Sequence, residues 1–436
     1  MNMKRFLIAL TAILLLIPAH DVVAQNEVKA HFKPYGFVRN YGIFDSRKSA
    51  SLTEEIFYLY PLDVDYADEE GTIDKNAVPN FKYQALTTRL GLNIVGYEFG
   101  KTRIEGKIEA DFYCLNSGGN IPTLRMRQAY SKLSWDNLGK KGIVDVNLVL
   151  GQTWHPMAAD MPHGINLETG APFNPFNRSA QAMVNVTLWD KLTFTGGIIS
   201  QLQYRSTGPA GSTNKYQIQA MIPEGYFGVS FAAGGFLGRA GVDLLTIKPR
   251  YGYTDSGERI KDILFTVSPM IYLQYTYEDF QVKAKSVLAQ AGEHLQMMTG
   301  YLCYDKSDPT HYKYSPLQQT CSFLSLQYGR ELQGMLMLGF AKNFGSIDPA
   351  LKDKDALYPN PDYIYVHSKA AKNIRLMFRV CPAIVYNLGK MQFGLEYNFT
   401  GVQFGNVNKL DIYGMADTNL HLVYNHRVTL MTKFNF

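Results

Sequence analysis

Apolar and polar residues alternate one by one along much of this chain. In the stretch IEGKIEADF (104–112) every second residue is charged, and the residues between are apolar or small. Such a period of two places alternate side chains on opposite faces of a β-strand. A helix cannot use it, because residues two apart point to different sides of a helix. The pattern recurs over residues 86–96, 144–150, 263–267, 391–400 and 428–436.

The connections between the predicted strands alternate in length. Seven short turns are predicted at Gly100–Lys101, 137–139, Asp190–Lys191, Glu224–Gly225, Glu278–Asp279, Arg330–Glu331 and Gly389–Lys390. Eight long polar loops are predicted over 46–83, 114–123, 155–179, 203–214, 251–260, 292–320, 345–371 and 405–420. Fifteen connections join about sixteen antiparallel strands. This arrangement is typical of an all-β, transmembrane up-and-down β-barrel, with short periplasmic turns and long extracellular loops.

The N-terminus has the features of a secretory signal. Lys4 and Arg5 precede the apolar run 6–18, and the small residues at 22–24 provide a cleavage site. We therefore expect residues 1–24 to be removed and residues 25–436 to form a single barrel domain. A formal net charge of only +5 over the whole chain argues against a nucleic-acid partner.

Cysteine is rare in this aromatic and glycine-rich chain. There are 29 Tyr, 25 Phe and 37 Gly but only 4 Cys, so a disulfide scaffold is excluded. Cys303 and Cys321 flank one polar loop, where they either form a disulfide or remain free. We expect Cys114 and Cys381, near predicted strands, to serve as small apolar residues.

The charged face of the strands is predicted to line an aqueous lumen. A basic side chain at mid-membrane on the lipid side would cost roughly 2 to 4 kcal/mol. The predicted pore-lining residues are Arg89, Glu105, Lys107, Glu109, Asp111, Arg125, Arg127, Lys283, Lys285, Arg375, Arg379, Glu396 and Arg427. Cations that recur on several strands favour a pathway for small anions. The alternative is that these charges pair with one another and fill the barrel wall.

The loop 155–179 is stiffened by four prolines and is rich in aromatic and small residues, so we expect it to pack against another part of the chain. The first loop is acidic between residues 53 and 75 but lacks regular calcium-ligand spacing, which indicates a solvated face or a latch against a neighbouring subunit. Four histidines stand in predicted loops without metal-type spacing and are expected to be ordinary polar residues: His155, His163, His294 and His311. No metal or cofactor is predicted.

Six segments follow one another along the chain: PYGFVRNYGIFDSR (34–47), TRLGLNIVG (88–96), IEGKIEADF (104–112), RMRQAY (125–130), GQTWHP (151–156) and the terminal RVTLMTKFNF (427–436). In this order they resemble Gram-negative outer-membrane porins and, among them, the DcaP-like family in Bacteroidetes-type sequences. The chain lacks the N-terminal coiled-coil segment found in some members of that family.

The resemblance implies a homotrimer in the outer membrane, in contact with lipid and lipopolysaccharide, whose pores admit small anions such as dicarboxylates. By analogy with sixteen-stranded porins, loop 155–179 is expected to fold inward and narrow the channel, with Glu168, Asn177 and Arg178 lining the constriction. The alternative is a surface loop packed over the barrel rim. The terminal Phe436 is similar to the aromatic signal read by the barrel-assembly machinery.

Three functions are compatible with these features. The first is a porin, not an enzyme, that lets small hydrophilic solutes diffuse with a moderate preference for anions. The second is a barrel enzyme of the lipase or protease type, which needs a nucleophile close to a histidine, and no G-x-S-x-G motif is present. The third is a closed structural or adhesive barrel.

Overall fold

The structure is a computed structural model that describes residues 30–52, 57–114, 121–139, 141–346, 363–366, 369–407 and 416–436. The predicted signal, residues 1–24, lies outside this part. Among the described residues, no helix has the length and apolar character needed to cross a membrane.

Most of the described chain forms β-strands. The wall strands are β1 (His31–Asp45), β4 (Asn80–Gln84), β5 (Arg89–Phe99), β6 (Thr102–Asp111), β7 (Arg125–Leu138), β8 (Val144–Trp154), β9 (Arg178–Leu188), β10 (Leu192–Ser200), β13 (Glu224–Ala233), β14 (Phe236–Ile247), β15 (Leu264–Tyr277), β16 (Phe280–Gln290), β19 (Gln318–Tyr328), β20 (Leu332–Gly345), β22 (Ile374–Leu388), β23 (Met391–Val407) and β24 (Ala416–Asn435). The loops carry β2 (Ser49–Leu52), β3 (Phe57–Pro61), β11 (Thr207–Gly208), β12 (Gly211–Ser212), β17 (Gly300–Asp305), β18 (Lys313–Pro316), β21 (Ile364–Val366), the α-helix α2 (Lys215–Ala220) and the 3-10 helices η1 (Gly292–Leu295) and η4 (Lys369–Asn373).

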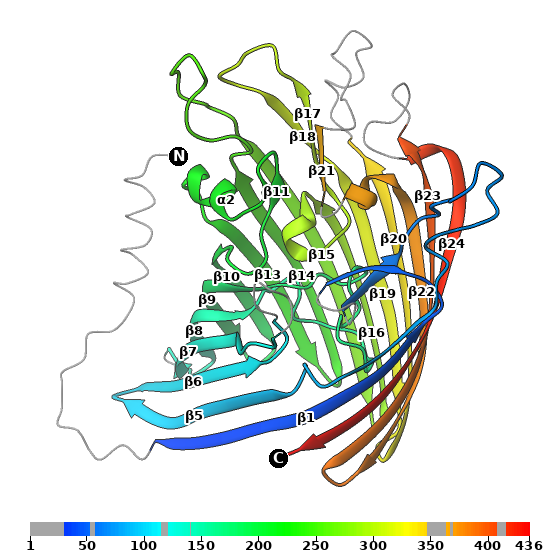
Figure 1. The fold of residues 1–436 in the computed structure, drawn as a ribbon. Helices are drawn as coiled ribbons and strands as arrows, with labels where there is room; N and C mark the ends of the chain where they lie inside the picture. The colour runs from blue at the N-terminus through cyan, green and yellow to red at the C-terminus, as the bar shows by residue number, and fades with distance from the viewer. Residues whose placement is uncertain are drawn as a thin grey trace.

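The wall is one antiparallel sheet that closes on itself. Each wall strand pairs with the next along the chain, except that β4 and β5 both pair with β1, and β1 pairs with β24 from Phe37 opposite Asn435 to Asp45 opposite Arg427. The sheet has 17 named strands, but β4 and β5 lie end to end along the same side of β1, which leaves sixteen positions around the barrel. Figure 1 shows the strands following one another from blue β1 to red β24, which lie side by side. The predicted all-β up-and-down barrel is confirmed.

The two faces of the wall differ as the alternation predicted. On β15, Phe265 and Ile271 are 56% and 52% exposed on the outside, whereas Thr266, Ser268 and Tyr272 are at most 2% exposed on the inside. The outer surface is thus apolar and the inner surface carries polar groups, as a barrel in lipid requires.

One predicted turn is wrong. Glu224 begins β13 instead of ending a strand, and the hairpin between β13 and β14 turns at Gly234–Gly235. Both glycines have positive φ, 55° and 81°, a conformation that two-residue hairpin turns need and that glycine adopts without strain. The preceding loop is correspondingly longer than 203–214 and contains α2.

None of the four cysteines forms a disulfide. Cys303 lies on β17 within a loop, and Cys321 lies on the wall strand β19. The possible Cys303–Cys321 disulfide is therefore absent, and Cys303, Cys321 and Cys381 pack as buried small residues.

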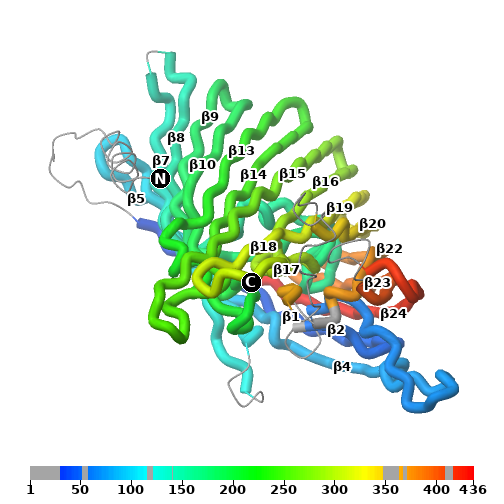
Figure 2. Tube along the Cα trace, turned by 90° about the horizontal axis from the view of Figure 1, so that it is seen from above, coloured from blue at the N-terminus to red at the C-terminus, as the bar shows by residue number. Residues whose placement is uncertain are grey.

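The short turns lie at one end of the barrel and the long loops at the other. The loop elements α2, β11, β17, β18 and β21 gather at the end drawn uppermost in Figure 1. Seen from above, β17 and β18 lie across the barrel opening (Figure 2). The loops therefore restrict the mouth of the barrel.

We expect Ile271→Arg, in the middle of β15 on the outer face, to lower the free energy of unfolding by about 2–4 kcal/mol, because the guanidinium would face hydrocarbon. Tyr277→Arg, on the same face at the turn end of the same strand, should cost about 0–1 kcal/mol. Urea unfolding in lipid vesicles measures both. Equal losses would contradict an outer face immersed in lipid.

Candidate functional site

The loop between β8 and β9 runs through the barrel interior. The carbonyl oxygens of Met157 and Asp160 accept hydrogen bonds from Lys285 Nζ on β16, at 2.5 and 3.2 Å. Further along, the Ile165 amide donates to Glu396 Oε2 on β23 at 3.0 Å. Because β16 and β23 are distant from β8 and β9 around the wall, the loop extends from one side of the lumen to others.

A buried arginine joins this loop to the first long loop. Arg379 on β22 donates from Nη1 to the Ala171 carbonyl at 3.0 Å and from Nη2 to the Leu59 carbonyl on β3 at 2.6 Å. Its Nη1 also lies 3.5 Å from Glu168 Oε1, and both side chains are 0% exposed. Two loops and the wall therefore meet at one guanidinium, which organises the interior packing.

A row of cationic side chains crosses the inner wall on β24, β1, β5 and β7. Three of its members surround one ring: Arg39 Cζ, Arg89 Cζ and Lys433 Nζ lie 4.9, 5.0 and 4.6 Å from the Phe37 centroid. Lys433 is directly opposite Arg39 and Phe37 is directly opposite Arg89, so the pairing register places all four on one face. Cations over an aromatic face are attracted by its quadrupole, which holds these side chains together despite their like charge.

The row continues onto β7 beside two carboxylates on β6. Arg125 forms a bidentate pair with Asp111, with distances of 3.0 Å from Nε and 2.9 Å from Nη2. Arg127 donates to Glu109 Oε1 at 2.8 Å and to Asp111 Oδ2 at 2.7 Å, and Arg89 lies 3.6 Å from Glu109. We call Lys433, Arg39, Arg89, Arg125 and Arg127 the basic row. Its five cations face only these two carboxylates in the contacts of the described residues.

A cavity of about 630 Å³ lies next to the end of the basic row. Its lining includes Arg125, Arg127 and Arg205 together with several aromatic rings, and we call it the mouth cavity. Its walls thus combine positive charge with apolar rings.

Arg178 lies against the aromatic side of the mouth cavity. Its guanidinium is 0% exposed and sits 4.7, 5.2 and 5.6 Å from the rings of Trp154, Phe176 and Tyr204. One nitrogen donates to the Tyr204 hydroxyl, and Nε and Nη1 have no hydrogen-bond partner among the described residues. A buried guanidinium with unused donors favours an anion nearby.

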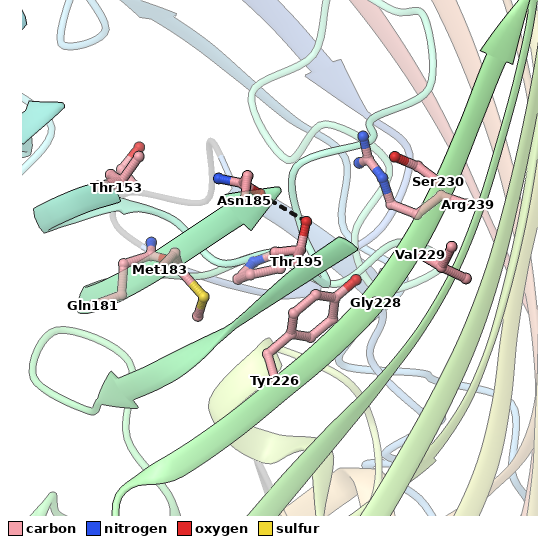
Figure 3. A pocket seen from close by; sticks show the side chains of 12 residues that line it. Thr153, Gln181, Met183, Asn185, Thr195, Tyr226, Gly228, Val229, Ser230 and Arg239 are labelled. Atoms are coloured by element: carbon pink, nitrogen blue, oxygen red, sulfur yellow. Dashed lines mark hydrogen bonds between the residues drawn. The ribbon is translucent and has the colours of Figure 1, made fainter. Parts of the chain in front are cut away.

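A second, smaller cavity of about 200 Å³ opens on the inner wall of β8, β9, β10, β13 and β14. Figure 3 shows Asn185 and Thr195 on its wall, joined by a 2.7 Å hydrogen bond, with Tyr226 and Arg239 beside them. Arg239 is ion-paired with Asp160 of the interior loop. We call this space the lower cavity; its lining mixes polar and apolar side chains and includes one basic residue, Arg239.

The remaining predicted pore-lining residues take other places. Glu105 lies 3.3 Å from Lys132, Lys107 Nζ is 5.3 Å from the Tyr35 ring, and Lys283 donates to the Met161 carbonyl at 3.2 Å. Arg375 lies at the start of β22, half-buried, and Arg427 pairs with Asp45 at 2.7 Å on the inner wall. Many of these charges pair, as the alternative interpretation expected, and their role in a solute pathway stays a prediction.

Several basic residues near the basic row and the two cavities were missed. Lys433 alternates with Thr432 and Phe434, so the period of two could have found it. Arg39 follows Phe37 and precedes Tyr41 on the inner face, where aromatic residues hide the alternation. Arg205 and Arg239 are brought to the cavities by a loop and by a glycine-rich strand.

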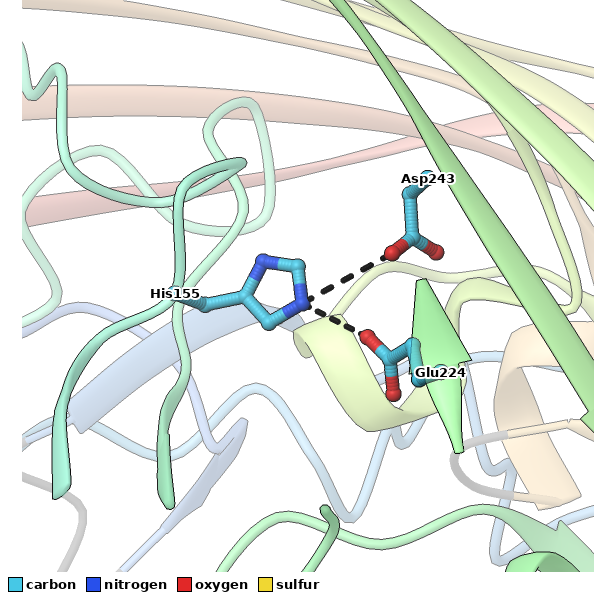
Figure 4. A group of neighbouring side chains, drawn as sticks. All are labelled: His155, Glu224 and Asp243. Atoms are coloured by element: carbon cyan, nitrogen blue, oxygen red, sulfur yellow. Dashed lines mark hydrogen bonds and ion pairs between the residues drawn. The ribbon is translucent and has the colours of Figure 1, made fainter. Parts of the chain in front are cut away.

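Two of the loop histidines are not ordinary polar residues. His155 and His294 are 0% and 2% exposed, and both ring Nε2 atoms lie near Glu224 Oε1, at 2.6 and 3.4 Å. Asp243 Oδ1 lies 3.8 Å from His155 Nε2, and Figure 4 shows the convergence of His155, Glu224 and Asp243. These residue types are those that could hold a metal ion.

The chain matches no family model and no curated protein sequence. It is similar in structure to the outer membrane channel DcaP of Acinetobacter baumannii, with a TM-score of 0.61 and 16% identity over 95% of this chain and 100% of that one. The chain has the fold of an outer-membrane porin. The anion-selective porin from Comamonas acidovorans (TM-score 0.53, 11% identity, covering 94% and 100%) and Salmonella typhi OmpF in complex with daunomycin (0.51, 11%, 95% and 100%) are also similar.

The predicted resemblance to DcaP-like porins is therefore confirmed for the fold. The barrel is that of an outer-membrane protein, as predicted. Sequence identities of 11–16% show a shared fold but not shared residue roles. The roles of individual residues therefore follow from the contacts within this chain's own barrel.

We expect Lys285→Met to loosen the interior loop, because the carbonyls of Met157 and Asp160 would lose a buried donor, at a cost of about 1–3 kcal/mol. Lys283→Met, on the same face two residues away, removes a single 3.2 Å bond and is the matched control. Hydrogen exchange of residues 155–177 measures the difference. Equal exchange in both variants would contradict the anchoring role of Lys285.

Proposed function

We propose that this protein is a passive channel of the Gram-negative outer membrane that admits small hydrophilic solutes and prefers anions. The barrel supplies the water-accessible passage and the interior loops limit its width. Small dicarboxylates are the proposed solute class, on the strength of the resemblance to DcaP-like porins.

The basic row is the observation that carries the anion preference. Five cations lie along one inner wall against Glu109 and Asp111, and Arg178 adds a buried cation with free donors. A wall with excess positive charge in a low-dielectric surrounding raises the local concentration of anions and repels cations. The ion pairs within the row orient the guanidinium groups without cancelling this excess.

The two cavities support passage of small solutes only. The mouth cavity, about 630 Å³, and the lower cavity, about 200 Å³, are of the size that holds compact molecules. Arginine donors and aromatic rings in the mouth cavity suit a carboxylate attached to an apolar body.

The enzyme hypothesis has less support. A hydrolase needs a nucleophile hydrogen-bonded to its base. Within the part of the chain that the structure describes, no histidine ring nitrogen has a hydrogen bond to a serine or cysteine side chain. The homotrimer, the contact with lipopolysaccharide and the recognition of Phe436 by the assembly machinery stay predictions.

We expect Arg125→Gln and Lys433→Gln each to lower the chloride-to-potassium permeability ratio by about two- to fivefold. The reason is that one charge a few ångströms from a permeating ion contributes about 1 kcal/mol in water. Arg125 is at the mouth cavity and Lys433 at the Phe37 ring, so the pair tests both ends of the basic row. Reversal potentials in planar bilayers under a KCl gradient measure the ratio.

Lys191→Gln is the matched control for these variants, because Lys191 is exposed in the turn between β9 and β10. It should leave the reversal potential unchanged. A wild-type channel that prefers potassium, or a control that shifts as much as the two variants, would refute the proposal. No ohmic conductance at all would instead support the closed barrel.

A further inference from the structure

The buried histidine–carboxylate cluster is assembled from four separate segments. His155 begins the interior loop, His294 lies in η1, and Glu224 and Asp243 come from neighbouring wall strands. All four side chains are at most 2% exposed. One ligand atom each from His155, Glu224 and Asp243 lies within 4.8 Å of the others, and His294 Nε2 is 3.4 Å from Glu224 Oε1.

The charges and hydrogen bonds of this cluster are incomplete. With neutral imidazoles the two carboxylates carry two negative charges, and neither has a lysine or arginine partner within 4.0 Å among the described residues. Three buried atoms lack a hydrogen-bond partner in the same part of the chain: Glu224 Oε2, Asp243 Oδ1 and His294 Nε2. Unpartnered buried acceptors of this kind are costly unless a proton or a metal cation is bound.

We propose that His155, His294, Glu224 and Asp243 form a binding site for one divalent transition-metal ion. Two imidazole nitrogens and two carboxylate oxygens suit zinc or a similar first-row ion better than calcium or magnesium, which prefer all-oxygen ligands. The two negative charges neutralise the ion. A bound ion would tie the interior loop and η1 to the wall.

His294 is already oriented for this role. Its Nδ1 faces the Ala291 carbonyl at 3.3 Å, so a proton on Nδ1 leaves the Nε2 lone pair for a metal. Backbone-held imidazoles of this type are common at metal sites.

His155 has to move its ring proton from Nε2 to Nδ1 before Nε2 can bind a metal ion. The Met157 amide donates to His155 Nδ1 at 3.1 Å, so the ring carries its proton on Nε2 and donates it to Glu224. On metal binding that proton moves to Nδ1 and the Met157 bond is lost. The ion exchanges its bound waters for the four ligands, and no oxidant or reductant is needed.

The lower cavity lies next to the cluster. Pro156, next to His155 in sequence, and Tyr226, directly opposite Asp243 on the neighbouring strand, both line that cavity. We therefore propose that an ion enters the cluster from this cavity.

The test uses the full-length protein purified in detergent without a polyhistidine tag, stripped with a chelator and dialysed. Zinc content is then measured by mass spectrometry after dialysis against Zn²⁺, and Co²⁺ is titrated while its visible d–d absorption is followed. We expect about one ion per chain and the intense absorption typical of low-coordinate cobalt. His294→Gln and Asp243→Asn should each weaken Co²⁺ binding at least about tenfold.

His311→Gln is the control, because His311 is an exposed histidine of the same long loop and lies outside the cluster. It should bind Co²⁺ like the wild type. Heat-modified migration in gels checks that each variant is folded, and the wild-type stoichiometry stands even if one variant is not. Wild-type protein that retains no zinc, or unchanged binding by folded His294→Gln, would overturn the proposal.

Discussion

Hydrocarbon cannot hydrogen-bond to a peptide group, and this constraint governs the whole architecture. Neighbouring wall strands pair around the barrel, and the last strand returns to the first, so that β24 pairs with β1 from Arg427 to Asn435. Even the break between β4 and β5 leaves β1 paired along both of its halves. Once the backbone groups are hydrogen-bonded in this way, each side chain faces either the lipid or the lumen according to its polarity.

In the lumen the difficulty is repulsion between like charges, because many basic side chains lie close together on the inner wall. The structure resolves this in two ways. Arg125 and Arg127 are held by carboxylates on β6, whereas Arg39, Arg89 and Lys433 share an aromatic ring. Arg89 also lies 3.6 Å from Glu109, but Arg39 and Lys433 have no carboxylate partner among the described residues, and their positive charge is the basis of the proposed anion pathway.

Loops decide how wide and how rigid that pathway is. The interior loop has its own apolar residues, Ile165 and Phe173 among them, packed in the core of the barrel, while wall residues such as Lys285 and Glu396 bind its polar groups. The same loop begins at His155, whose buried contact with Glu224 links the loop to the start of β13. Loop position, pore width and the histidine–carboxylate cluster are therefore parts of one packing arrangement.

Local alternation in the sequence was enough to predict the strands and the lipid-facing side, because a period of two acts residue by residue. The count of connections predicted the sixteen-position barrel, and its closure was expected because lipid permits only closed sheets. The alternation also placed Arg125, Arg127 and Glu109 on one face. It could not place Arg39, whose inward neighbours are aromatic, nor distinguish Glu224 in a strand from Glu224 in a turn. Which cations meet, which carboxylates lack a partner and how His155 reaches His294 were decided only by the tertiary structure, because those contacts depend on strand register and loop paths between residues far apart in the chain.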